Sequence, residues 1–174
     1  MQNPVMRLKE TRDNLLGRIE LYSKPDSAAA RSISSLLDSF KNHLKEDDDL
    51  TFPLVDSLLS SLQSGKFTTQ LDSNNFARAT RLQESFQNIC LEHREIKRKI
   101  EQATKVASTI QDGNLVLLLR ELSHYVEFEE SILYPVAKAV AYSTVSRSHQ
   151  FAIDPCLVPA DKPPEAFELM CGIP

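Results

Sequence analysis

The residues best suited to chemistry are histidines and acids grouped in three segments of the chain. "HLKEDDDLTFP" begins at His43 and carries Asp47 one helical turn later, "LEHREI" contains His93, and "HYVEFEESILYP" begins at His124 and contains Glu129. Imidazole nitrogens combined with carboxylate oxygens form a donor set that suits iron, manganese or zinc. The three segments therefore predict the ligands of one metal site, drawn from three separate parts of the chain.

A shared site requires these side chains to face one another, and the hydrophobic pattern indicates which of them do. Four segments carry apolar residues at alternating steps of three and four, as expected for the buried stripe of a helix. His93, Asp47 and Glu129 lie on such stripes, with His43 beside Asp47, and burying an isolated carboxylate is costly without a cation, a proton or a hydrogen-bonded partner. The stripes are Val5, Leu8, Arg12, Leu15, Ile19 and Tyr22; Ile33, Leu37, Phe40, Leu44, Asp47, Thr51 and Leu54; Leu82, Phe86, Ile89, His93, Ile96, Ile100 and Ala103; and Leu118, Leu122, Tyr125, Glu129, Ile132 and Val136.

The same periodicity assigns the neighbouring acids to the surface. Asp48 and Asp49 point away from the stripe that contains Asp47, and Glu130 points away from the stripe that contains Glu129. The alternative for the first segment is a solvated acidic turn that ends at a proline, and the position of Asp47 on the stripe favours burial instead.

The stripes lie on helices that are separated by helix-breaking residues. We expect helices over about 5–22, 27–62 with an interruption near Pro53, 72–108 and 114–142, separated by "SKPDS", "SGK" and "QDGN". Long helices joined by short polar loops predict an all-α, up-down-up-down four-helix bundle over residues 1–142. Residues 143–174 hold five of the nine prolines and are expected to form an extended or partly disordered tail on the bundle.

The totals favour one cytosolic domain. A chain of 174 residues can bury an ordinary core. The net charge of -4, with "HREIKRK" expected to be a solvated helix edge, argues against a nucleic-acid partner. No apolar stretch reaches the roughly 20 residues that cross a bilayer, and no signal peptide is expected. Three cysteines without CxxC spacing predict neither a disulfide framework nor a thiolate zinc site, and Cys90 is expected to be a small core residue.

Taken together, the three segments resemble the motifs of the hemerythrin-like, or HHE cation-binding, family. The resemblance covers about residues 5–142. It implies a non-heme di-iron centre inside a four-helix bundle, with five histidines and two bridging carboxylates. By position, His43, His93 and His124 correspond to imidazole ligands, and Asp47 and Glu129 correspond to the bridging carboxylates. Proteins of this family bind oxygen, sense oxygen or redox state, or handle nitric oxide and iron.

The chain departs from the family pattern in each of three helices. "LKETRDNLL" resembles the opening motif, but Arg12 stands where a histidine is expected, and Lys97 stands in place of a second histidine in the third helix. His124 precedes Glu129 by five residues, whereas ideal helix geometry turns Tyr125 inward instead, so His124 needs a local helix distortion to reach the site. The chain has four histidines, so five histidine ligands cannot come from one subunit.

Two hypotheses remain open at this level. In the first, the protein is not an enzyme, because no nucleophile and base pair is recognisable, and it binds one or two non-heme irons through a reduced ligand set. In the second, Arg12 forms a salt bridge with Asp47 or Glu129, which leaves a metal-free bundle that binds a protein partner. "LLDSF" and "FARATRLQESFQNI" are faintly similar to four-helix regulators of the bacterial housekeeping sigma factor. The oligomeric state is not specified by the sequence.

Overall fold

The computed structural model describes residues 3–24, 27, 29–65 and 73–152, with side chains described to residue 146. These residues form an all-α fold. The helices are α1 (Pro4–Glu20), α2 (Ala30–Glu46), α3 (Phe52–Ser64), α4 (Ser73–Thr109), α5 (Gly113–Phe128) and α6 (Tyr134–Ala152). Three short helical turns, η1 (Leu21–Ser23), η2 (Asp47–Thr51) and η3 (Glu129–Leu133), extend α1, join α2 to α3 and join α5 to α6.

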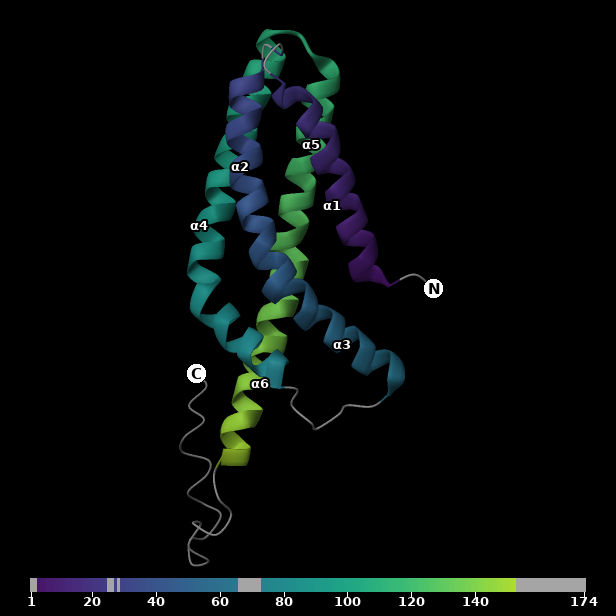
Figure 1. Cartoon of the computed structure of the whole chain (residues 1–174), viewed down its shortest axis with the longest axis vertical. Helices are drawn as coiled ribbons and strands as arrows, with labels where there is room; N and C mark the ends of the chain where they lie inside the picture. The colour runs from purple at the N-terminus through teal and green to yellow at the C-terminus, as the bar shows by residue number, and fades with distance from the viewer. Residues whose placement is uncertain (1–2, 25–26, 28, 66–72, 153–174) are drawn as a thin grey trace, which may run out of the picture.

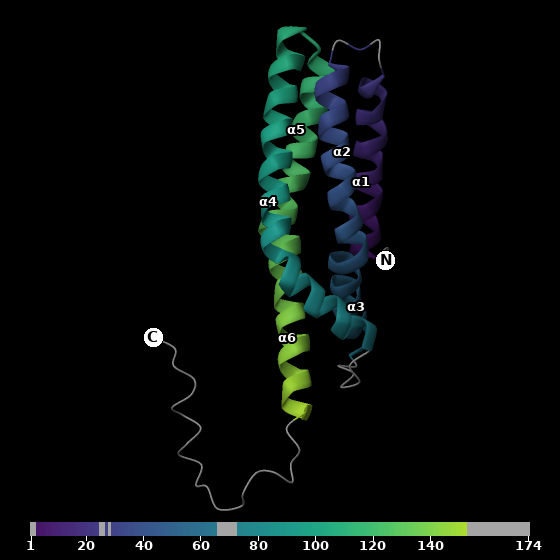
Figure 2. The same ribbon diagram turned by 60° about the vertical axis from the view of Figure 1, so that its left-hand side comes forward.

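The helices pack as the four-helix bundle that the sequence predicts. Figure 1 and Figure 2 show α1, α2, α4 and α5 running alongside one another, with α3 diverging below α2 and α6 continuing the line of α5. The 37-residue helix α4 is the longest described, and it contacts α2, α5 and α6. It thereby connects the part of the bundle around α5 with the part around α6.

The helix ends follow from local sequence. The Asn3 side chain accepts a hydrogen bond from the Val5 amide, with Pro4 at the first helical position of α1. Asp112 caps α5 in the same way, through the Leu115 amide at 3.0 Å. Gly65 ends α3 with a φ of 62°, a left-handed conformation that glycine adopts without steric cost. These caps fix where the helices of the bundle begin and end.

The fourth helical segment is longer than expected. Helix α6 extends to Ala152 rather than to about Tyr142, so the expected tail boundary at residue 143 falls inside a helix. "YSTVSRSHQ" contains neither proline nor glycine, so nothing in it interrupts the helix begun upstream. The remainder of the expected tail, residues 153–174, lies outside the described residues.

A layer of buried polar residues divides the hydrophobic core along the length of the molecule. One hydrophobic cluster joins α1, α2, α5 and the C-terminal half of α4, and the other joins the start of α1, η2, α3, α6 and the N-terminal half of α4. Along the chain from α2 to α3, along α4 and from α5 to α6, the change from one cluster to the other occurs at polar residues that are at most 1% exposed: His43 and Asp47, His93, and Glu129. Burying four such groups in one layer is costly unless they form hydrogen bonds with one another or bind a ligand.

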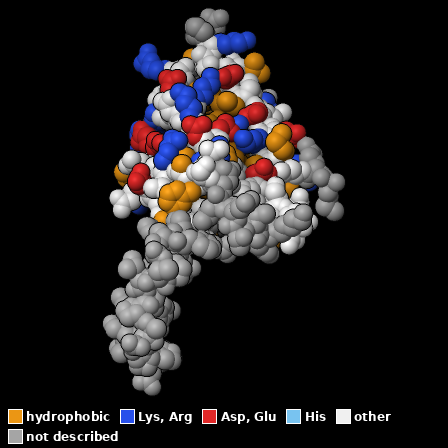
Figure 3. Space-filling model, turned by 60° about the horizontal axis from the view of Figure 1, so that its bottom comes forward, with side chains coloured by type: hydrophobic (Ala, Val, Ile, Leu, Met, Phe, Trp, Pro, Cys, Tyr) orange, Lys and Arg blue, Asp and Glu red, His pale blue; other side chains and the backbone are white. Residues whose placement is uncertain are grey.

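The surface is mixed in charge. On the face shown in Figure 3, acidic and basic side chains are interspersed with scattered hydrophobic ones. Within the described part of the chain, no helix is long and apolar enough to span a membrane. Cys90, expected in the core, is only half-buried.

Candidate metal centre

Two wide helical turns, η2 and η3, begin at the two buried acids. In each turn the amide five residues after the acid donates to the carbonyl of the acid, which is the π-helical pattern. Both turns are followed by an aromatic residue and a proline: Asp47 precedes Phe52 and Pro53, and Glu129 precedes Tyr134 and Pro135. A proline ring inside an α-helix clashes with the carbonyl four residues earlier, and the wider turn relieves this clash.

The wide turn after Glu129 brings Tyr134 into the centre. In an ideal α-helix, a residue five positions on lies about 140° around the axis from Glu129. The extra residue accommodated by η3 instead buries Tyr134, which is 3% exposed, and turns Ile132 outward at 51% exposed. The prediction that Ile132 lies on the buried stripe is therefore wrong, and Val136, also predicted on this stripe, is only half-buried. The repeated aromatic and proline pair was the sequence signal for Tyr134.

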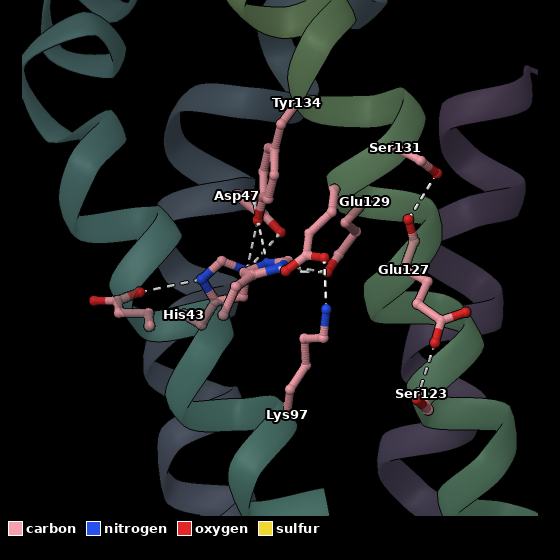
Figure 4. Close-up of polar contacts among 11 residues, drawn as sticks. His43, Asp47, Lys97, Ser123, Glu127, Glu129, Ser131 and Tyr134 are labelled. Carbon is pink, nitrogen blue, oxygen red and sulfur yellow. Dashed lines mark hydrogen bonds and ion pairs between the residues drawn. The ribbon is translucent and has the colours of Figure 1, made fainter.

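His43, His93 and Tyr134 place three polar atoms in mutual contact. The two Nε2 atoms lie 2.9 Å apart, and the Tyr134 hydroxyl lies 2.7 Å from Nε2 of His43 and 2.8 Å from Nε2 of His93. Figure 4 shows Tyr134 directed at the imidazole of His43, with Asp47 beside it. The three groups come from α2, α4 and α6, so the site is assembled across the bundle.

The two buried acids complete this cluster. Asp47 Oδ2 lies 3.4 Å from Nε2 of His43, and Glu129 Oε2 lies 3.5 Å from Nε2 of His93. The Tyr134 hydroxyl donates to Asp47 Oδ1 at 3.1 Å. Among the described residues, neither oxygen of Glu129 nor Oδ2 of Asp47 has a hydrogen-bond partner. The centre thus contains buried carboxylate oxygens that lack donors.

Outer carboxylates lie beside Nδ1 of both imidazole rings. Glu92 Oε2 lies 3.1 Å from Nδ1 of His43, and Glu130 Oε1 lies 3.4 Å from Nδ1 of His93. Glu130 was expected to face solvent. Its side chain is 36% exposed, but it also contacts His93. A carboxylate at Nδ1 directs the Nε2 lone pair inward, an arrangement typical of metal-binding histidines. Lys97 binds Glu130 at 2.9 Å.

Without a metal, the cluster must take up protons. One hydroxyl proton cannot satisfy two Nε2 lone pairs and the carboxylate oxygens together. Burial, reinforced by the charge of Asp47, raises the pKa of Glu129 well above its usual value. Burial alone lowers the pKa of His43, but Asp47 and Glu92 raise it overall, whereas burial and His43 lower the pKa of His93 to about 4. A cation would replace these protons.

The donor spacing fits a single ion. Two ligands about 2.1 Å from one metal lie about 3.0 Å apart at a right angle and about 3.4 Å apart at a tetrahedral angle. The separations of 2.9 Å between the two Nε2 atoms and 3.5 Å between His93 Nε2 and Glu129 Oε2 match these values, and the 4.0 Å between His43 Nε2 and Glu129 Oε2 corresponds to a wider angle at the ion. One ligand atom from each of His43, His93 and Glu129 falls within 4.8 Å of the others. This buried triad can hold a metal.

Arg12 does not neutralise the centre by the salt bridge considered above. Its guanidinium binds Asp48 at 3.0 Å and Asp13 at 2.9 Å, and it lies 5.4 Å from the ring centroid of Phe52. Arg12 is 6% exposed, and its carboxylate partners are not Asp47 or Glu129. Asp48 was expected to face solvent; its side chain is 42% exposed but holds Arg12.

His124 is not brought to the cluster. Its side chain is exposed, whereas the adjacent Tyr125 is buried and packs edge-on against Phe40. The required distortion would have to lie between His124 and Glu129, but η3 begins only at Glu129, and the preceding turns of α5 are regular. His124 is thus corrected from a candidate ligand to a surface residue. The side chain of His149 lies outside the described residues.

Comparison of the chain with protein-family models, with curated proteins and with solved structures found no match. The all-helical bundle and its buried His43, His93 and Glu129 triad therefore stand on the geometry alone.

Proposed function

We propose that this protein binds one non-heme iron ion at the triad of His43, His93 and Glu129, with Asp47 and Tyr134 completing the donor set. The observation that carries the proposal is the buried carboxylate of Glu129, whose oxygens have no hydrogen-bond partner among the described residues. Its Oε2 lies 3.5 Å from Nε2 of His93 and 4.0 Å from Nε2 of His43, and these two Nε2 atoms lie 2.9 Å apart. An uncompensated carboxylate in this position is costly, and a cation removes the cost.

The donor types support iron. Two imidazoles and a carboxylate form the set that suits non-heme iron(II), and no cysteine is part of the triad. The resemblance of the three segments to hemerythrin-like proteins points in the same direction. Because His124 is exposed and Arg12 and Lys97 replace family histidines, too few imidazoles remain for a dinuclear centre of the family type.

Iron held in this way would supply a centre that binds small ligands and changes its oxidation state. The chain's own residues then have separate tasks. Glu92 and Glu130 orient the imidazoles, the Tyr134 hydroxyl supplies a proton to Asp47, and the two hydrophobic clusters exclude water from either side. We infer that the protein senses or handles oxygen, nitric oxide or iron rather than catalysing turnover of an organic substrate.

The test is metal content after anaerobic reconstitution of the full chain with Fe(II), Mn(II) or Zn(II), followed by removal of free metal. We expect about one iron per chain, as for a preformed buried site. His93→Ala should abolish stoichiometric binding, and His124→Ala, at an exposed position on α5, should retain it. Substoichiometric content with all three metals, or equal content in the His93→Ala variant, would refute the proposal.

A further inference from the structure

A hollow of about 450 Å³ opens between α4 and α6 and reaches the edge of the metal centre. Its size lies within the range of small-molecule sites. Helix α4 contributes residues from one face, α6 contributes residues from two successive turns, and η3 contributes Glu130. The lining is Phe86, Cys90, His93, Arg94, Glu130, Tyr134, Pro135 and Lys138. His93 and Tyr134 belong to both the hollow and the centre, so a bound molecule would lie against the metal site.

The hollow carries an excess of positive charge. Among the described residues, neither Arg94 nor Lys138 forms an ion pair, and Lys138 instead lies 4.5 Å from the ring centroid of Phe86. The one acid in the lining, Glu130, is already bound by Lys97 at 2.9 Å and lies 3.4 Å from Nδ1 of His93. Two cations without carboxylate partners favour an anion as the occupant.

The remaining walls favour a flat apolar body on that anion. Phe86 and Pro135 face the hollow from opposite helices, with the thiol side chain of Cys90 beside them. The ring of Phe86 also meets Tyr134 edge-on, with centroids 6.4 Å apart, which holds it in place. Aromatic rings pack well against such side chains.

We propose that this hollow binds a small aromatic carboxylate, with its ring between Phe86 and Pro135 and its carboxylate held by Arg94 and Lys138. Binding to the hollow depends only on these residues. Its role, as an organic anion that the centre senses together with its small ligand, rests on the proposed iron site. His93 and Tyr134 provide the connection, because each contacts both the hollow and the buried cluster.

Calorimetric titration of the full chain with benzoate tests the proposal, first without metal and then after loading with Fe(II). We expect benzoate to bind both forms and benzamide, its neutral analogue, to bind about tenfold more weakly, since a charged hydrogen bond contributes roughly 1.5 kcal/mol or more. Arg94→Gln and Lys138→Gln should each weaken benzoate binding about tenfold. Lys105→Gln, an exposed cation further along α4, should leave it unchanged.

The location is checked by nuclear magnetic resonance, where benzoate should shift the signals of His93 and Tyr134. Cys90→Phe, which places a ring in the hollow, should abolish binding while metal content stays at the wild-type level. Equal affinity for benzoate and benzamide, wild-type affinity in both cation variants, or no binding at millimolar benzoate would overturn the proposal. Binding of benzoate by a chain that takes up no iron would support the proposed anion site in the hollow and refute only the proposed iron site.

Discussion

The hydroxyl of Tyr134 lies 2.7 Å from Nε2 of His43, although 91 residues separate the two in the chain. The contact crosses from α6 to α2 and depends on η3, the wide turn that directs Tyr134 inward. The same hydroxyl donates its one proton to Asp47, so it can only accept a hydrogen bond from a protonated Nε2 of His43 or His93. Tyr134 is therefore central to the candidate centre.

Tyr134→Phe should lower the affinity for iron by about tenfold or more, the usual effect of removing a group that supports metal ligands. The change removes the hydroxyl while keeping the ring that packs against Phe86. Competition with a chelator measures the affinity.

Tyr142→Phe is the matched control, because Tyr142 lies on the same helix α6 and is 66% exposed. It should leave iron affinity near the wild-type value. Equal losses in the two variants would contradict a specific role for Tyr134.

Glu129→Gln should have opposite effects on metal binding and on stability. Removing the carboxylate removes a metal ligand, so iron content should fall. The metal-free protein should gain about 1 to 3 kcal/mol in free energy of unfolding, because folding no longer has to desolvate and protonate Glu129, whose pKa is raised well above its usual value by burial and Asp47. Urea denaturation of the metal-free chain measures the gain. Glu127→Gln, at an exposed position on the same helix, should change neither quantity, and a destabilised Glu129→Gln variant would count against the argument.

Iron binding should stabilise the fold by mass action. At a free Fe(II) concentration about one hundred times the dissociation constant, the gain is about 2.7 kcal/mol, or about 5 to 10 °C in Tm for a domain of this size. Thermal unfolding under anaerobic conditions, with and without Fe(II), measures the shift. It should disappear on chelation and be absent from His93→Ala, and a shift of the same size in that variant would indicate binding elsewhere.

Sequence periodicity was sufficient for the bundle and for the inward direction of Asp47, His93 and Glu129. The structure buries the apolar stripe residues on both sides of Asp47 and His93, and those before Glu129. His43 and His93 could be placed together because the helices that carry them are neighbours in an up-down bundle. The regular parts of α2, α4 and α5 therefore follow from a period of 3.6 residues.

Periodicity did not predict the inward-facing residues where the helix was irregular, and it did not predict an ion pair where several acids were available as partners. The turn η3 shifts every later residue of its helix, so Tyr134 replaces Ile132 on the inner side. Arg12 had several acids within reach. The side chains of adjacent acids such as Asp47 and Asp48 point in directions about 100° apart around the helix axis, and the sequence does not show which of them faces Arg12. Arg12 forms an ion pair with Asp48 rather than Asp47 because of how α1 packs against the start of η2.

Arg12→Met should separate stability from metal binding. The guanidinium is buried at 6% exposed and binds Asp48, so its loss should lower the free energy of unfolding by about 1 to 2 kcal/mol, less than for a fully buried pair because Asp48 is partly exposed. Iron content should stay at the wild-type value, because Arg12 contacts neither Asp47 nor Glu129. Arg18 lies on α1, as Arg12 does, and forms an exposed ion pair with Glu121 of α5. Arg18→Met removes this pair and should lower the free energy of unfolding by at most about 0.5 kcal/mol. An iron content that rises in Arg12→Met would show instead that the guanidinium competes with the metal for the buried acids.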